Sequence, residues 1–107
     1  MAIDKKYIQP DIRLEVLRQL GIVLDRSDLL TARRLVEKAD EAMADHHDEL
    51  AGQFRNLESL FHYRSGDYQK SLAASRIAAS VLAPYGESSD LGQAYLLSGK
   101  ALVAMGN

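Results

Sequence analysis

The stretch that most constrains the fold of this chain runs from Phe54 to Leu82, where two apolar stripes flank a short polar turn. Apolar side chains recur at steps of three and four residues before the turn, and the same spacing resumes after it. The turn is Ser65-Gly66-Asp67. Its glycine can take the left-handed conformation that ends a helix, and its aspartate can cap the next helix. The stretch therefore predicts two antiparallel helices joined by a tight turn.

The same period appears on both sides of this stretch and predicts five helices, with no alternating pattern that would indicate strands. We expect the helices at residues 10–24, 29–44, 49–64, 68–83 and 90–105. The fourth is expected to bury Leu72, Ile77, Ala78, Val81 and Leu82. Pro10 suits the first turn of the first helix, and Ser27 or Asp28 can cap the second. Residues 1–9 are too irregular for a helix and are expected to form an N-terminal arm.

Composition limits the classes of protein that fit this pattern. A length of 107 residues suits one domain, and contents of 47% apolar and 26% charged residues are ordinary for a globular protein. The chain has no cysteine, which excludes disulfides, zinc–thiolate sites and thiol nucleophiles. No apolar run reaches the roughly 18 to 20 residues that cross a bilayer, and a net charge of -2 argues against a general phosphate-binding surface. We expect a cytoplasmic protein with neither a membrane nor a nucleic-acid partner.

Three of the expected helices share a pattern of four positions, which we call anchors. The first is a large residue, the second is apolar or small, the third is usually small, and the fourth is again large. The three copies are Leu17-x2-Leu20-Gly21-x2-Leu24, Phe54-x2-Leu57-Glu58-x2-Phe61 and Tyr95-x2-Ser98-Gly99-x2-Leu102. The helices between them carry small residues seven positions apart, Ala32 with Ala39 and Ser71 with Ala78. Small side chains at that spacing allow a neighbouring helix to approach closely. The repeated unit is thus a pair of helices.

This pattern resembles the tetratricopeptide repeat (TPR), which has a bulky residue, a Leu-Gly pair and a Tyr in its first helix and an Ala in its second. The likeness is most specific at residues 65–68 and 95–106. It implies an all-α fold of antiparallel helix pairs, stacked as a short right-handed TPR-like solenoid over residues 10–107. The chain departs from the family at Glu58, where a small residue is usual, and at Ser71, which replaces Ala. With two pairs and one further helix, we expect a fragment of a longer protein.

Catalytic and metal-binding patterns in the sequence give little support for an enzyme. The serines lie in expected turns or on helix faces without an oriented base, and no phosphate-binding loop is present. Asp45-His46-His47-Asp48 offers four potential metal ligands, but adjacent side chains diverge and the spacing of histidines at i and i+4 is absent. We interpret it as a solvated connection, with an adventitious metal at His46 or His47 as the alternative. We expect no enzyme activity, cofactor or metal.

The resemblance implies partner binding on the concave face, which TPR arrays line with the first helix of each pair. Carried over by position, it predicts a groove made by the helices at 10–24, 49–64 and 90–105. The predicted partner-binding residues are Arg18, Ile22, Arg55, Ser59, His62, Gln93, Leu96 and Lys100. The basic members, Arg18, Arg55 and Lys100, would suit an acidic segment or a chain-terminal carboxylate.

The function we expect is a non-catalytic protein–protein interaction module that binds a peptide or a partner domain in this groove. The alternative is an N-terminal regulatory and dimerisation domain, either of a bacterial signalling enzyme such as a diguanylate cyclase or of a transcription regulator. In that alternative, the apolar outer face of the helix at 90–105 packs on a second copy or on the next domain. The two hypotheses differ in the surface that the partner covers.

Overall fold

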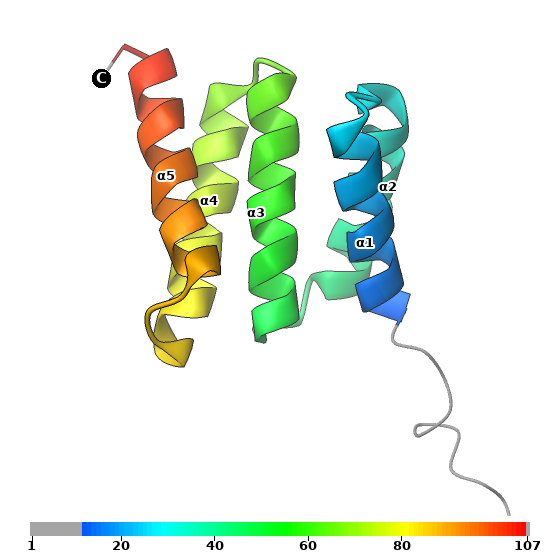
Figure 1. Cartoon of the computed structure of the whole chain (residues 1–107), viewed down its shortest axis with the longest axis horizontal. Coiled ribbons are helices and arrows are strands. Elements are labelled where there is room, and N and C mark those ends of the chain that lie inside the picture. Colours follow the sequence, from blue (N-terminus) through cyan, green and yellow to red (C-terminus); the bar gives the residue numbers. More distant parts are fainter. Residues whose placement is uncertain (1–11, 107) are drawn as a thin grey trace, which may run out of the picture.

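A computed structural model describes residues 12–106, and within this range the five expected helices are present without any strand (Figure 1). They are α1 (Ile12–Asp25), α2 (Leu29–Met43), α3 (Glu49–Arg64), α4 (Tyr68–Leu82) and α5 (Ser89–Ala104), with a 3-10 helix, η2 (Ala83–Tyr85), before α5. The all-α prediction is confirmed. The expected N-terminal arm and Pro10 lie outside the described residues. None of the helices in the described range has both the length and the apolarity to cross a membrane.

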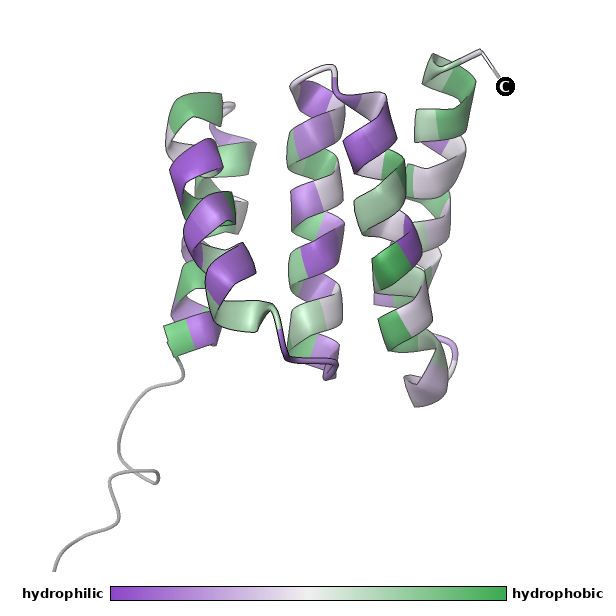
Figure 2. Ribbon diagram, turned by 180° about the vertical axis from the view of Figure 1, so that it is seen from behind, coloured by the Kyte–Doolittle hydropathy of each residue, from purple (hydrophilic) through white to green (hydrophobic). Residues whose placement is uncertain are grey.

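The helices stack in two layers, as antiparallel pairs that follow one another along a row (Figure 1). One layer contains α1, α3 and α5, and the other contains α2 and α4. The central helix, α3, contacts each of the other four. Helix α5 closes one end of the row, while the α1/α2 pair forms the other end. The solvent-facing turns of α2 are coloured as hydrophilic in Figure 2, as expected for a helix with one buried stripe.

Short polar side chains set the start of four helices. Asp28, Asp48, Asp67 and Ser88 each accept a hydrogen bond, at 3.0–3.1 Å, from the backbone N–H three residues later. Gly66 has a φ of 82°, which confirms the predicted left-handed turn, and Ser27 takes the same conformation after α1 with a φ of 58°. Asp28 is therefore the cap of α2, and Ser27 ends α1.

The largest core cluster joins α1, α2 and α3 around two phenylalanines of α3. Phe54 and Phe61 are 0% and 1% exposed. The buried residues packed with them are Leu17, Leu20, Leu24, Ala32, Val36, Ala39 and Met43. Each large buried side chain removes apolar surface from water, which contributes roughly 1.5–3 kcal/mol. Neither the α1/α2 pair nor α3 could bury these stripes alone, so the cluster holds the first pair on α3.

Two arginines reinforce this attachment at opposite ends of the helices. Arg13 of α1 forms an ion pair at 2.9 Å with Asp48, the residue that caps α3. At the other end, Arg64 of α3 donates to the backbone carbonyl oxygen of Leu24, in the last turn of α1. An arginine near a helix C-terminus satisfies a carbonyl that has no partner within its own helix. The two contacts fix how far α1 can slide along α3.

Helix α4 packs on the other side of α3 through small residues. A Cβ atom added to Gly52 would lie 2.5 Å from Cγ of Leu82, so only glycine fits at this position without a shift. Seven residues further along α3, Ser59 Oγ donates to the carbonyl oxygen of Ser71 at 2.8 Å, and both side chains are fully buried. Small residues on both helices therefore set the close α3–α4 approach, as the spacing of Ser71 and Ala78 predicts.

One residue assigned to the core by its spacing is exposed. Ile77 of α4 is 47% exposed, so the expectation that it is buried was wrong. Ile77 lies at the edge of the apolar stripe, on the side where α2 and α4 diverge, and it lines a groove instead of packing. Helical spacing identifies a stripe without showing which of its edges meets a neighbour.

The close approach at Gly52 gives a stability prediction. We expect Gly52→Ala to lower the free energy of unfolding by about 1–3 kcal/mol, because the new methyl group overpacks against Leu82. Gly21→Ala is the matched control: no atom lies within 4 Å of its added Cβ, and alanine favours helix over glycine by about 1 kcal/mol. Urea denaturation followed by circular dichroism measures both. Equal stabilisation by the two substitutions would contradict the packing described for Gly52.

Candidate functional site

The first candidate site is a groove on the layer of α1, α3 and α5, which we call the α1/α3/α5 groove. It has a volume of about 410 Å³ and receives side chains from all three helices. Its lining residues are Leu14, Leu17, Arg18, Gln53, Asn56, Leu57, Asp90 and Gln93. The groove combines leucine side chains with amide and carboxylate groups. Concave sites with apolar walls and a few polar groups are typical of binding sites.

Asn56 supplies the most distinctive polar group of this groove. Its side chain is 6% exposed, and its Nδ2 donates to the backbone carbonyl oxygen of Asp90 at 2.8 Å. Gln53 Nε2 donates to the carboxylate of the same Asp90 at 3.0 Å. Asn56 Oδ1 is buried and has no hydrogen-bond partner among the described residues. An unsatisfied buried acceptor costs about 1–3 kcal/mol, so a ligand N–H that reached it would be favoured.

A second groove, of about 400 Å³, is lined by side chains of α2, α3 and α4. We call it the α2/α3/α4 groove. Its lining residues are Arg33, Val36, Glu37, Asp40, Arg55, Glu58, Phe61, His62, Lys70, Ala73, Ala74 and Ile77. Three of these carry arginine or lysine charges and three carry carboxylates, so the groove is not a basic site.

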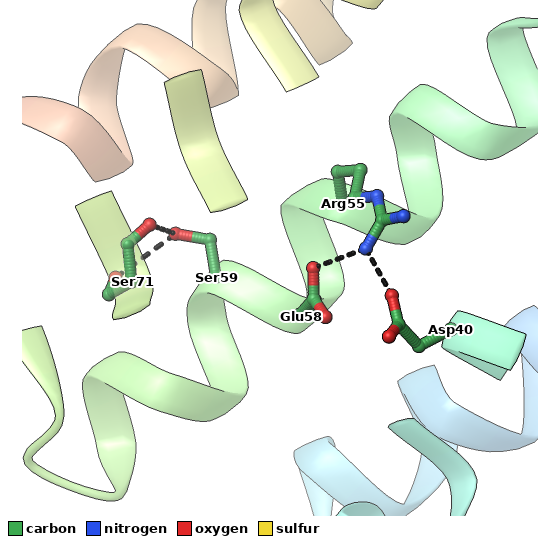
Figure 3. Close-up of polar contacts among 5 residues, drawn as sticks. All are labelled: Asp40, Arg55, Glu58, Ser59 and Ser71. Atoms are coloured by element: carbon green, nitrogen blue, oxygen red, sulfur yellow. Dashed lines mark hydrogen bonds and ion pairs between the residues drawn. The ribbon is translucent and has the colours of Figure 1, made fainter. Parts of the chain in front are cut away.

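Arg55 is held within this second groove by two carboxylates (Figure 3). Its Nη1 lies 2.5 Å from Asp40 Oδ1 and 2.9 Å from Glu58 Oε1. Burial acts to lower the pKa of Arg55, but the bonds to Glu58 and Asp40 outweigh it, and the pKa is raised. Burial raises the pKa of the Glu58 carboxyl above its usual value in spite of Arg55. The guanidinium thus serves an internal network that joins α2 to α3.

His62 lies beside this network, and burial lowers its pKa. Its ring meets the ring of Phe61 edge to face, with centroids 5.1 Å apart. The guanidinium of Arg33 lies 5.4 Å from the centroid of the same Phe61 ring, within cation–π range. A histidine with a depressed pKa is neutral at pH 7, so His62 adds a hydrogen-bonding ring to the groove and no charge.

The structure distributes the eight predicted partner-binding residues over several places. Arg18 and Gln93 line the α1/α3/α5 groove, whereas Arg55 and His62 line the α2/α3/α4 groove. Leu96 and Lys100 line a separate hollow of α5 beside Tyr63. Ser59 is 0% exposed and bonded to Ser71, and Ile22 is 39% exposed on α1 without lining either groove. The basic residues Arg18, Arg55 and Lys100 therefore do not meet in one groove.

Residues missed by the sequence analysis occupy neighbouring positions on the same helices. Leu17 lies one position before Arg18, and Asn56 lies one position after Arg55; one position turns a side chain by about 100° around a helix. Ser27 and Gly66 are the left-handed residues that end α1 and α3, and their positions in the sequence indicate where Leu17 and Asn56 lie on these helices. Leu17 precedes Ser27 by ten positions, and Asn56 precedes Gly66 by the same number. Alignment on these turns pairs Leu17 with Asn56 in the groove, but the same count from Gly106 of α5 reaches Leu96, which lines the separate hollow.

The connection between α2 and α3 and the turn after α3 have simple structural roles. His46 and His47 are exposed, and across residues 12–106 there is no group of three or more His, Asp or Glu side chains that could hold a metal ion. Tyr63 and Tyr68 flank the turn with ring centroids 5.3 Å apart. The two rings thus pack against each other beside the turn between α3 and α4.

Comparisons of the chain with protein-family models, with curated proteins and with solved structures found no match in any of the three. The TPR resemblance therefore rests on the residues of this chain. Function has to be inferred from the geometry and chemistry of the two grooves and of the exposed helix faces.

The raised pKa of Glu58 gives a pH prediction. Because the pKa is higher in the folded protein than the ordinary 4.5, the folded state gains stability from this group below that pH and loses it as the pH rises through the folded value. We expect Glu58→Gln, which stays neutral, to gain stability relative to the wild type as the pH is raised from about 4 to 8.

Urea denaturation at a series of pH values measures this difference. Glu41→Gln is the matched control, because it makes the same substitution at an exposed position of α2 outside the α2/α3/α4 groove. A difference between Glu58→Gln and the wild type that does not change with pH would contradict the account of this carboxyl.

Proposed function

We propose that this chain is a non-catalytic, TPR-like interaction module that binds a segment of another protein in the α1/α3/α5 groove. The observation that supports it most is the buried, unpartnered Oδ1 of Asn56 in a groove lined by leucines. A bound segment would place an apolar side chain against Leu14, Leu17 and Leu57 and an N–H group at Asn56. The first contact removes apolar surface from water, and the second gives the already buried Oδ1 of Asn56 a hydrogen-bond partner.

The charges of the groove indicate the chemistry of the segment. Asp90 contributes a carboxylate, and the guanidinium of Arg18 already lies 3.0 Å from Glu15 of the same helix. Arg55, which sequence alone assigns to the same groove, instead lines the α2/α3/α4 groove, where it pairs with Asp40 and Glu58. The arrangement favours a segment that brings an apolar side chain flanked by N–H donors, such as backbone amides or basic side chains, over the acidic segment that the sequence suggests.

A second candidate function is the regulatory and dimerisation domain of a signalling protein, such as a diguanylate cyclase or a transcription regulator. The observation that favours it is the outer face of α5, where Tyr95, Leu96 and Val103 are 60%, 52% and 76% exposed. Single exposed apolar residues are ordinary, but three on one helix at the end of the row form a surface suited to association.

Selection from a library of random peptides tests the groove directly. We expect the wild type to enrich peptides with an apolar residue next to Lys, Arg, Asn or Gln. Leu14→Glu should weaken their binding by roughly tenfold or more, because it places a charge in the apolar part of the groove.

Leu30→Glu is the matched control. Leu30 is 68% exposed on α2 and Leu14 is 55% exposed on α1, so both changes replace an exposed leucine by the same charge. Equal loss of binding in the two variants, or enrichment of acidic peptides only, would contradict the proposed groove.

A further inference from the structure

The outer side of α5 carries a regular alternation of small and large residues. Gly92, Leu96, Gly99 and Val103 follow one another at intervals of four, three and four residues, so they share one side of the helix. All four are exposed. The buried residues of α5 occupy the opposite side, toward the rest of the protein, and are Leu91, Ala94, Leu97 and Ala101. The four exposed residues form a stripe on the end helix of the row, opposite the buried side of α5, and Leu96, Gly99 and Val103 also line the hollow beside Tyr63 of α3.

The intervals between the residues of this stripe are four, three and four, whether they are counted from Gly92 or from Val103. If two α5 helices run antiparallel, with their centres between residues 97 and 98, Leu96 of each copy lies over the partner's Gly99. Val103 of each copy lies over the partner's Gly92. Each large side chain then fills the space left by a glycine, and the same surface serves both copies, as a two-fold interface requires. We infer that a second copy of this chain docks on α5 in this antiparallel register.

Other arrangements of the two helices fit less well. In a parallel pair in register, leucine would meet leucine and glycine would meet glycine. The paired large side chains would hold the helices apart and leave gaps at the glycines. Charge also favours the antiparallel pair, because the positive N-terminal end of each helix dipole adjoins the negative C-terminal end of the other. Lys100 flanks the stripe, and its level along the axis is close to that of the partner's Gln93, which is uncharged.

The protein already uses a glycine–leucine contact to pack two of its own helices. Leu82 of α4 sits against Gly52 of α3, closely enough that no Cβ atom would fit between them. At Gly92 and Gly99, by contrast, no atom lies within 4 Å of an added Cβ, so these glycines are not required by the packing of the single chain. The proposed contact would use them in the way that Gly52 is used, to bring a large side chain close to a helix backbone.

The size of the contact limits its strength. A helix of 16 residues is about 24 Å long, and one such pair makes an interface at the small end of specific contacts, below about 1,200 Å². Interfaces of this size usually give weak association, so the dimer is expected at micromolar and not nanomolar concentrations. The stripe does not include Leu14 or Asn56, so self-association is separate from the peptide binding proposed for the α1/α3/α5 groove.

Disulfide cross-linking tests the register. Because the chain has no native cysteine, only the introduced cysteines can form a disulfide. Gly92→Cys and Val103→Cys are made in two chains of different size and mixed under oxidising conditions. In the proposed dimer the two sites lie at the same level, so the mixed disulfide forms. Val103→Cys alone should not cross-link, because its two copies lie about 16 Å apart along the axis. Rapid cross-linking of Val103→Cys alone, or the absence of the mixed product, would overturn the proposed register.

Sedimentation tests whether the stripe drives association in solution. The wild type should shift from monomer to dimer between low micromolar and about 1 mM, and Gly99→Leu should raise the dimer dissociation constant by roughly tenfold or more. Gly99→Leu should not unfold the chain, because the site is open and leucine favours helix. Leu96→Asp is a second variant with the same expected effect. Glu41→Leu, which adds a leucine to exposed α2, should leave the dimer unchanged.

A wild type that stays monomeric throughout this range would overturn the inference and would point to a different occupant of α5. Dimers that persist in both Gly99→Leu and Leu96→Asp would overturn it as well. Binding of library peptides can be measured on the monomeric variants, so a failure of the dimer and a failure of the groove are told apart.

Discussion

The fold depends on the difference in side-chain size between the two sides of α3. One side carries Phe54 and Phe61, which fill the core shared with α1 and α2. The other side carries Gly52 and Ser59, which leave room for α4 to approach until Leu82 and Ser71 touch the helix. Large residues on both sides would hold α4 away, and small ones on both sides would leave α1 and α2 without a core. Helix α3 therefore joins α1 and α2 on one side to α4 and α5 on the other, and these two halves do not share a continuous buried cluster.

The same arrangement positions the functional surfaces. Because α3 contacts helices of both layers, its remaining residues face two grooves, with Gln53 and Asn56 in one and Arg55 and Glu58 in the other. Asn56, which lines the first groove, has a buried Oδ1 without a hydrogen-bond partner among the described residues, whereas the charges of the second groove are largely satisfied within the protein. This contrast in hydrogen-bond satisfaction is the reason for placing peptide binding in the α1/α3/α5 groove. The outer face of α5 is a third surface, whose glycines, Gly92 and Gly99, have open space where a side chain would stand.

Local chemistry made the elements predictable from sequence, whereas the site depended on packing. Gly66 and Asp67 predict the turn between α3 and α4. The expected range of residues 49–64 matches α3. The prediction for α3 was wrong by one position, naming Arg55 where Asn56 lines the groove. The reason is that the anchors were aligned on Leu-Gly pairs and not on the turns that end each helix. The bond between Ser59 and Ser71 and the pairing of Arg55 join residues from different helices, so helical spacing alone could not indicate them.

Native-state hydrogen exchange tests most directly the claim that α3 joins the two halves. If the account is right, the slowest amides to exchange are those in the middle of α3, near Phe54, Asn56 and Phe61, because opening α3 requires both helix pairs to separate. Amides of α1 and α5, each packed on fewer neighbours, should exchange faster at low denaturant concentration. Protection that is higher in the α1/α2 pair or in α5 than in α3, with the halves opening independently, would contradict it.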